Sequence, residues 1–209
     1  AILGAGVKTF VRYSKALRIL SLDCDFLSLD PQAGEPIKHF TKQRAKDAPG
    51  GEMNRLYVLE NRYTLTGGMA DHRKPFAASL IPAAAALIAE TLGDSSAKAL
   101  ADTATPGVRE WLGPVIRDLV DHKGKALVLA GSRYGAEVHA LVAYINNALG
   151  AYGSTIELRQ SSGEAELGGS AELAAAVSSG AVKTLVSLTP SNLLFDAPAS
   201  FAAAVEEKG

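Results

Sequence analysis

Short runs of branched aliphatic residues alternate along this chain with longer segments in which apolar residues recur at helical spacing. The runs are bounded by Gly, Asp or Pro, a pattern typical of buried β-strands. They predict strands over 17–22, 56–60, 125–131, 154–159 and 183–188. The longer segments predict helices over 35–47, 77–92, 106–121, 134–149, 170–179 and 198–207.

The order of these elements predicts an α/β fold. Strands separated by helices imply right-handed crossovers, so we expect a Rossmann-like, mainly parallel sheet of about five strands with helices on both faces. The interval between strands 56–60 and 125–131 is too long for one crossover, which predicts a helical insertion. The length fits a single α/β domain over 1–209, and the alternative is a small C-terminal lobe over 151–209.

Composition and charge exclude several classes of function. The chain has 47% hydrophobic and 21% charged residues, as ordinary globular proteins do. Its net charge is −1 with scattered Lys and Arg, so we expect no binding to nucleic acid. Cys24 is the only cysteine, which excludes an internal disulfide, an iron–sulfur cluster and a cysteine-based zinc site. Pro82 interrupts the longest apolar stretch, 76–93, so we expect no membrane insertion.

Ligands of open parallel sheets bind beyond the carboxyl ends of the strands, so the residues after each predicted strand are candidates for function. Gly131 and Ser132 precede a predicted helix, where backbone N–H groups favour an anion. The stretch lacks both the dinucleotide fingerprint and the P-loop lysine, and Ser132 is better explained as a helix cap. No metal site is predicted.

Asp23 and Asp25 follow the first predicted strand and argue against a phosphate there. A carboxylate a few ångströms from an anion repels it by about 1 kcal/mol in water, and by more when both are partly desolvated. The pair could instead hold a hard cation or act as acid and base. Capping of the local turn by these side chains is the interpretation we favour.

The densest polar stretch, 64–75, contains Asp71, His72 and Arg73. His72 titrates most readily near neutral pH, so a small-molecule α/β enzyme using Asp23, Asp25 and His72 is one hypothesis. It requires the three side chains to meet in one pocket. No nucleophile elbow accompanies these residues, so the interpretation we favour is a structural Asp–Arg pair in this loop.

Four stretches together resemble a known family: ILSLDCDFL (19–27), MNRLYVLENRYTLTGGMADHRKP (53–75), HALVAYINNALGAYG (139–153) and GAVKTLVSLTPSNLLFDAPASFAAAV (180–205). They are similar to the molybdopterin-oxidoreductase-like region of the large iron–sulfur subunit of alternative complex III, a bacterial quinol:electron-acceptor oxidoreductase. The resemblance extends from about residue 12 to the end of the chain. More distantly, the layout resembles the complex iron–sulfur molybdoenzymes.

The resemblance also implies where a cofactor pocket would have been. In the molybdoenzymes the first strand ends in Gly-x-Asn-Pro, where this chain has Asp-Cys-Asp-Phe (23–26). Their second strand ends in Asp-Pro-Arg-x-Thr, which helps to hold the guanine nucleotide and matches Glu-Asn-Arg-Tyr-Thr (60–64) here. Their last strand again leads into Gly-x-Asn-Pro, of which 189–193 keeps only the Asn. The implied vestigial pocket consists of Asp23, Asp25, Glu60, Arg62, Gly131, Ser132 and Asn192.

These departures place bulk and negative charge where a pyrophosphate would need close backbone approach. The resemblance therefore implies a scaffold domain without cofactor or catalytic residues, which packs against other domains and subunits of a membrane-associated electron-transfer complex. The parent would be an oxidoreductase subunit at the periplasmic face of the membrane. The alternative is a domain that binds molybdopterin guanine dinucleotide.

Overall fold

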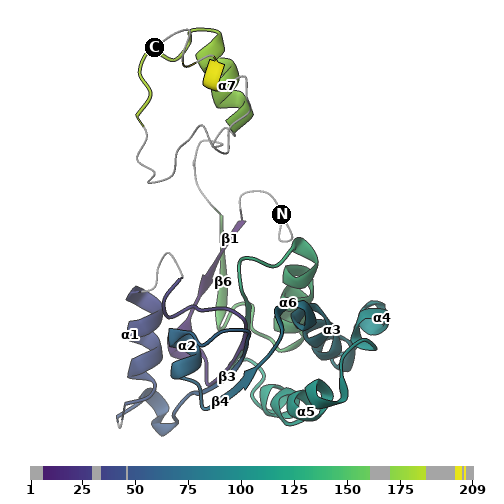
Figure 1. Ribbon diagram of the computed structural model, residues 1–209. Helices are drawn as coiled ribbons and strands as arrows, with labels where there is room; N and C mark the ends of the chain where they lie inside the picture. Colours follow the sequence, from purple (N-terminus) through teal and green to yellow (C-terminus); the bar gives the residue numbers. More distant parts are fainter. Residues whose placement is uncertain are drawn as a thin grey trace. The chain divides into compact units, whose positions relative to one another are not determined.

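The computed structural model describes residues 7–29, 34–45, 47–160, 170–186, 201–203 and 205. The chain divides into two compact units, 1–160 and 161–209, whose elements are labelled in Figure 1. The first unit contains the sheets and the second contains a short helical region. None of the helices in the described ranges has the length and apolar character needed to span a membrane.

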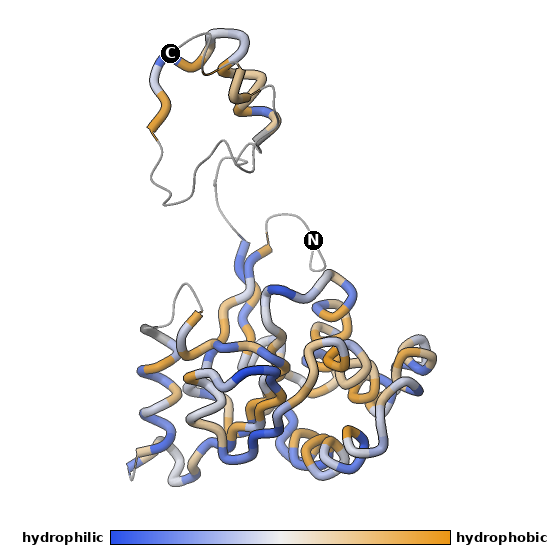
Figure 2. The backbone as a smooth tube through the Cα atoms, viewed as in Figure 1, coloured by the Kyte–Doolittle hydropathy of each residue, from blue (hydrophilic) through white to orange (hydrophobic). Residues whose placement is uncertain are grey.

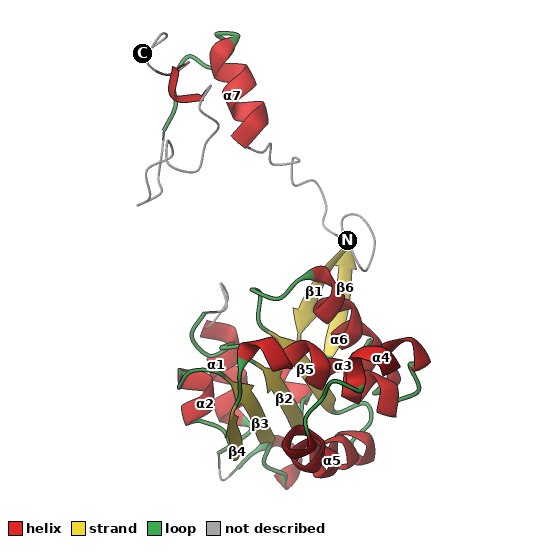
Figure 3. Ribbon diagram, turned by 45° about the vertical axis from the view of Figure 1, so that its right-hand side comes forward, coloured by secondary structure: helices red, strands yellow, loops and turns green. Residues whose placement is uncertain are grey.

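The first unit is built on a parallel sheet of four strands in the order β4-β3-β2-β5 (Figure 3). The register aligns Arg18 with both Arg55 and Ala126. The sheet confirms the predicted Rossmann-like α/β fold, with three of its strands at predicted positions. The strands are β2 (Arg18–Leu22), β3 (Arg55–Glu60), β4 (His72–Pro75) and β5 (Ala126–Ala130).

Helices cover both faces of this sheet because its central strands are apolar on both sides. On one face Leu20, Leu59 and Val128 belong to a core shared with α3 (Ile81–Thr91), α4 (Lys98–Ala101), α5 (Pro106–Asp121) and α6 (Ala136–Ala148). On the other face Ile19 and Val58 pack with Phe40 of α1 (Gly34–Lys42). Figure 2 shows the apolar residues gathered along the central strands and the helices that cover them.

The long interval between β3 and β5 contains the predicted helices and one strand that was not predicted. Besides α3, α4 and α5, it holds α2 (Leu65–Gly68) and the edge strand β4. The sequence of β4 is HRKP, which has no β-branched or aromatic residue. Short, charged and proline-containing edge strands resist pairing with other chains, and the same features conceal them from sequence patterns.

The predicted strand over 154–159 forms as β6 (Ile156–Gln160), but it does not join the parallel sheet. It pairs antiparallel with β1 (Val7–Val11), a strand that the sequence pattern missed. An ion pair between Arg12 and Glu157, with 2.6 Å between Nη2 and Oε2, fastens one end of this pair. Hydrogen bonds from Arg12 and Arg159 lower the pKa of Glu157 to about 2.

The second unit contains α7 (Ser170–Ser178) and helical residues at 201–203 and 205, in agreement with two predicted helices. Ala174, Val177 and Phe201 form its small apolar cluster. The predicted strand over 183–188 is wrong for 183–186, which are not in a strand, and its last two residues lie outside the described ranges. Asn192 lies outside them as well.

Candidate functional site

The carboxyl ends of β2 and β5 form the topological switch point of the sheet. The chain runs from β2 outward through β3 to β4 and then returns to β5 on the other side of β2. Ligands of such sheets bind at this point. A cleft of about 370 Å³ opens there, and its lining includes five of the predicted residues: Asp23, Asp25, Arg62, Gly131 and Ser132. Of the other two candidates, Glu60 is not part of this lining, and Asn192 lies outside the described residues.

Asp23 closes the turn that follows β2. Its backbone has a φ of 54°, in the left-handed region that non-glycine residues rarely adopt. Its carboxylate is 5% exposed, forms an ion pair with Arg133, and accepts a hydrogen bond of 2.7 Å from the Tyr134 hydroxyl. The two partners belong to the loop after β5, so the Asp23 side chain bridges the two sides of the switch point.

Gly131 allows this loop to approach the β2 turn. A Cβ atom at this position would lie 2.3 Å from the carbonyl oxygen of Asp23. The Gly131 N–H also donates to the Leu22 carbonyl at 3.1 Å. The glycine therefore packs the loop against the neighbouring backbone.

Ser132 is not the predicted helix cap. Helix α6 begins at Ala136, its N-cap residue is Gly135, and no side chain caps it. A turn closed by the Tyr134 N–H and the Gly131 carbonyl, 3.2 Å apart, separates Ser132 from the helix. The serine side chain is instead exposed at the cleft.

Asp25 fastens a distant segment rather than its own turn. One carboxylate oxygen, Oδ1, accepts from the hydroxyl and the backbone N–H of Thr66, at 2.7 and 3.1 Å. The local turn is capped by Ser21, whose hydroxyl bonds to the backbone of Cys24. The expected capping of the turn by the two aspartates is therefore wrong, because tertiary contacts hold both carboxylates.

Glu60 lies outside the cleft and fastens the turn after β3. Its side chain is 2% exposed, forms an ion pair with Arg73, and accepts from the Thr64 hydroxyl at 2.6 Å. The predicted Asp–Arg pair between residues 71 and 73 is wrong, because Arg73 pairs with Glu60. Asp71 instead pairs with Arg44, at 2.5 Å between Nη2 and Oδ1.

His72 lies away from the two aspartates of the first predicted turn. It stacks on Tyr57, with 5.1 Å between ring centroids, and lines a separate groove beside α5. The cleft that contains Asp23 and Asp25 does not include it. The geometry required for an enzyme using these three residues is therefore not observed. His72 begins β4 and pairs with Tyr57, whereas Asp23 follows the carboxyl end of β2.

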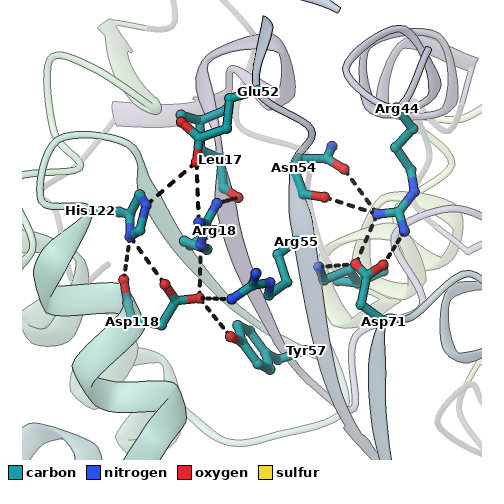
Figure 4. Close-up of polar contacts among 11 residues, drawn as sticks. Leu17, Arg18, Arg44, Glu52, Asn54, Arg55, Tyr57, Asp71, Asp118 and His122 are labelled. Atoms are coloured by element: carbon teal, nitrogen blue, oxygen red, sulfur yellow. Dashed lines mark hydrogen bonds and ion pairs between the residues drawn. The ribbon is translucent and has the colours of Figure 1, made fainter. Parts of the chain in front are cut away.

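A second polar cluster, drawn in Figure 4, surrounds Asp118 of α5. Oδ2 of Asp118 accepts from the Tyr57 hydroxyl at 2.6 Å, from Arg18 Nε at 2.8 Å and from Arg55 at 3.2 Å. His122 lies 3.2 Å from its other oxygen. Burial acts to raise the Asp118 pKa, but the hydrogen bonds from Tyr57 and Arg18 outweigh it and keep the pKa below 3.8. No sequence pattern predicted this cluster, since its members come from elements far apart along the chain: β2, β3 and α5.

Two groups at the switch point already have partners within the chain: the backbone of Gly131 packs closely against Asp23, and the Arg133 guanidinium pairs with the Asp23 carboxylate. Across the described part of the chain, no three His, Cys, Asp or Glu side chains are grouped so that they could hold a metal ion.

No protein-family model matches the chain, and no curated protein is significantly similar to it.

Replacing Tyr134 with Phe tests the contact that closes the turn. We expect a loss of about 1 kcal/mol in the free energy of unfolding at neutral pH, because one hydrogen bond to a buried carboxylate is removed. Burial, together with the bond to Asp23, raises the pKa of Tyr134 to about 12 from 10.0. The hydroxyl therefore stabilises the fold below pH 10.0, and this contribution disappears as the pH rises toward about 12.

Urea unfolding of wild type and Tyr134→Phe at neutral pH and between those two pH values measures both effects. The difference in stability should narrow as the pH rises. A difference that is constant with pH, or absent at neutral pH, would show that the Tyr134 hydroxyl does not hold Asp23.

Proposed function

We propose that this chain is a cofactor-free, molybdopterin-oxidoreductase-like scaffold domain of a membrane-associated, quinol-oxidising electron-transfer complex. One observation carries the proposal. The turn after β2, at the switch point where a sheet of this kind takes its ligand, carries the Asp23 carboxylate, which Arg133 and Tyr134 hold in place. The sheet and the resemblance supply the framework, and the acidic turn supplies the difference from cofactor-binding members of the family that the chain resembles.

The charges at the switch point also support a domain without a bound cofactor. A bound pyrophosphate would lie near Asp23 and Asp25, and each carboxylate repels an anion more strongly once water is excluded. Among the described residues of the lining, only Arg62 offers a cation without a carboxylate partner, which is one positive charge against these two carboxylates. Arg133 compensates the charge of Asp23 but is thereby unavailable to the anion. Glu60, at the position that would contact the guanine nucleotide by resemblance, is held by Arg73 and Thr64.

Exposed apolar side chains support a role in packing against neighbouring domains and subunits. Tyr63, Leu65 and Met69, which lie in and beside α2, are 74%, 57% and 40% exposed. These three lie within seven residues of the chain, and exposed apolar side chains that adjoin one another mark interaction surfaces. In this proposal the redox centres belong to other parts of the parent oxidoreductase, at the periplasmic face of the membrane, and this chain contributes no catalysis.

Metal analysis and calorimetry of the purified chain test the absence of a cofactor. We expect no stoichiometric molybdenum or iron, and no saturable heat with guanosine diphosphate or molybdopterin guanine dinucleotide at millimolar concentration. Asp23→Gly is the variant to compare with wild type. Glycine accepts the φ of 54°, so the substitution removes the carboxylate while it keeps the backbone conformation of the turn. Stoichiometric molybdenum, or micromolar nucleotide binding by wild type, would favour the cofactor-binding alternative instead.

The scaffold role is tested in the parent. We expect the reading frame beside this segment to encode cysteines at iron–sulfur cluster spacing. Deleting the segment should prevent assembly of the complex, while the clusters of the remaining subunit persist in its electron paramagnetic resonance spectrum. Normal assembly without the segment would contradict the proposal.

A further inference from the structure

The cleft at the switch point retains two charged groups of opposite sign that face it without a complete set of partners. Arg62 is exposed, and no described residue forms a hydrogen bond or ion pair with its guanidinium. Asp25 uses Oδ1 for Thr66, while Oδ2 accepts no hydrogen bond within the described ranges. Both side chains line the same cleft.

The remaining lining of the cleft is largely apolar. Val11 and Leu129 are partly buried and pack against the core cluster of this face. Tyr13 and Phe26 stack beside them, with 4.9 Å between ring centroids. A ligand in the cleft would therefore place its charged groups near Arg62 and Asp25 and its apolar part on this wall.

The balance of charge selects among ligands. Asp23 and Arg133 neutralise each other, so among the acidic, lysine and arginine side chains of the lining, which also includes His139, Arg62 and Asp25 remain as one positive and one negative group. A simple carboxylate would be attracted by Arg62 and repelled by Asp25, and a simple amine would meet the reverse. A zwitterion satisfies both groups. The volume of about 370 Å³ lies at the small end of ligand pockets, which suits a molecule far smaller than a dinucleotide.

We propose that this cleft binds an apolar α-amino acid, with its carboxylate on Arg62, its ammonium group on Asp25 and its side chain against Val11 and Leu129, the partly exposed part of the apolar wall. Charge-assisted hydrogen bonds to both ends orient the molecule, and the apolar wall favours an aromatic or branched side chain. This inference does not depend on the scaffold function, because it concerns only the cleft of the first unit.

Three probes of one shape test the proposal on the full chain. L-phenylalanine carries both charges, 3-phenylpropanoate lacks the ammonium group, and 2-phenylethylamine lacks the carboxylate. Titrations followed by nuclear magnetic resonance should show saturable binding of L-phenylalanine, with each of the other probes at least about tenfold weaker. Equal binding of all three, or no saturable binding of L-phenylalanine at millimolar concentration, would overturn the proposal.

Two substitutions assign the ends of the ligand. Arg62→Gln should weaken the binding of L-phenylalanine and 3-phenylpropanoate about tenfold and should not weaken that of 2-phenylethylamine. Asp25→Asn should weaken the binding of L-phenylalanine and 2-phenylethylamine about tenfold and should not weaken that of 3-phenylpropanoate. Asn keeps an oxygen that can accept from Thr66, so the fold should persist. Arg117→Gln is the control, because Arg117 is exposed on α5 and lines the other groove. If Asp25→Asn does not fold, Arg62→Gln decides, and unchanged affinities in that variant would refute the proposal.

Discussion

Replacing Asp118 with alanine is expected to lower the free energy of unfolding by about 3–5 kcal/mol, because it leaves a buried positive charge without its main partner. Arg18 is 8% exposed and reaches Asp118 at 2.8 Å. Arg18 has one other carboxylate partner, Glu52, which is 46% exposed and accepts only from Nη2 of Arg18, at 3.2 Å. The substitution also removes the acceptor of the Tyr57 hydroxyl, which lies 2.6 Å from Asp118.

Because of the same cluster, we expect the free energy of unfolding to depend on pH. The pKa of Asp118 is lower in the folded protein than its ordinary value of 3.8, so its contribution to stability is present above that value and is lost as the pH falls through the folded pKa. The difference between wild type and Asp118→Ala should therefore narrow in acid. Urea unfolding at neutral pH and below pH 3.8 measures it.

A matched control uses an ion pair on the surface. Asp102 pairs with Lys98 at 3.0 Å within one helical turn, but both side chains are largely exposed. Asp102→Ala should cost about 0.5 kcal/mol or less, since water screens such pairs. If Asp118→Ala were no more costly than this control, the buried cluster would contribute little to the stability of the fold.

Sequence periodicity predicted the parts of the fold that depend on local burial. The predicted strands 17–22, 56–60 and 125–131 correspond to β2, β3 and β5, and helix α5 has the predicted bounds, 106–121. These segments are buried on one or both sides, so their own residues carry the signal. Strand β4 forms through backbone pairing with β3 while its side chains stay polar, and periodicity therefore missed it.

The candidate site was predicted in position but not in its contacts. Reading the residues after each strand located Asp23, Asp25 and Gly131 at the same cleft, because parallel strands bring their carboxyl ends to one edge. The partners that determine what these residues do, Arg133, Tyr134 and Thr66, lie dozens of residues away. Tertiary pairing of this kind leaves no periodic signal, so the aspartates were assigned to local turns.

Replacing Gly131 with alanine is expected to lower the free energy of unfolding by about 3 kcal/mol, at the upper end of the usual cost of overpacking. The added Cβ would lie 2.3 Å from the carbonyl oxygen of Asp23. That oxygen belongs to the backbone of a turn already held by the Asp23 N–H bond to Leu59, 2.7 Å long, so no side-chain rotation can relieve the clash. The loop after β5 must move away from β2 instead.

Movement of that loop should also expose the Tyr134 hydroxyl and open its contact with Asp23, so the pKa of Tyr134 should fall from about 12 toward 10.0 in the variant. Urea unfolding and a spectrophotometric titration of the tyrosines measure the two effects together. Gly135→Ala is the control from the same loop, because its φ of −68° suits alanine and no atom lies within 4 Å of the added Cβ. Equal stability of the two variants would mean that the loop does not need to approach Asp23 closely. The scaffold proposal would then be supported by the contacts of the Asp23 side chain alone, and no longer by the close backbone contact at Gly131.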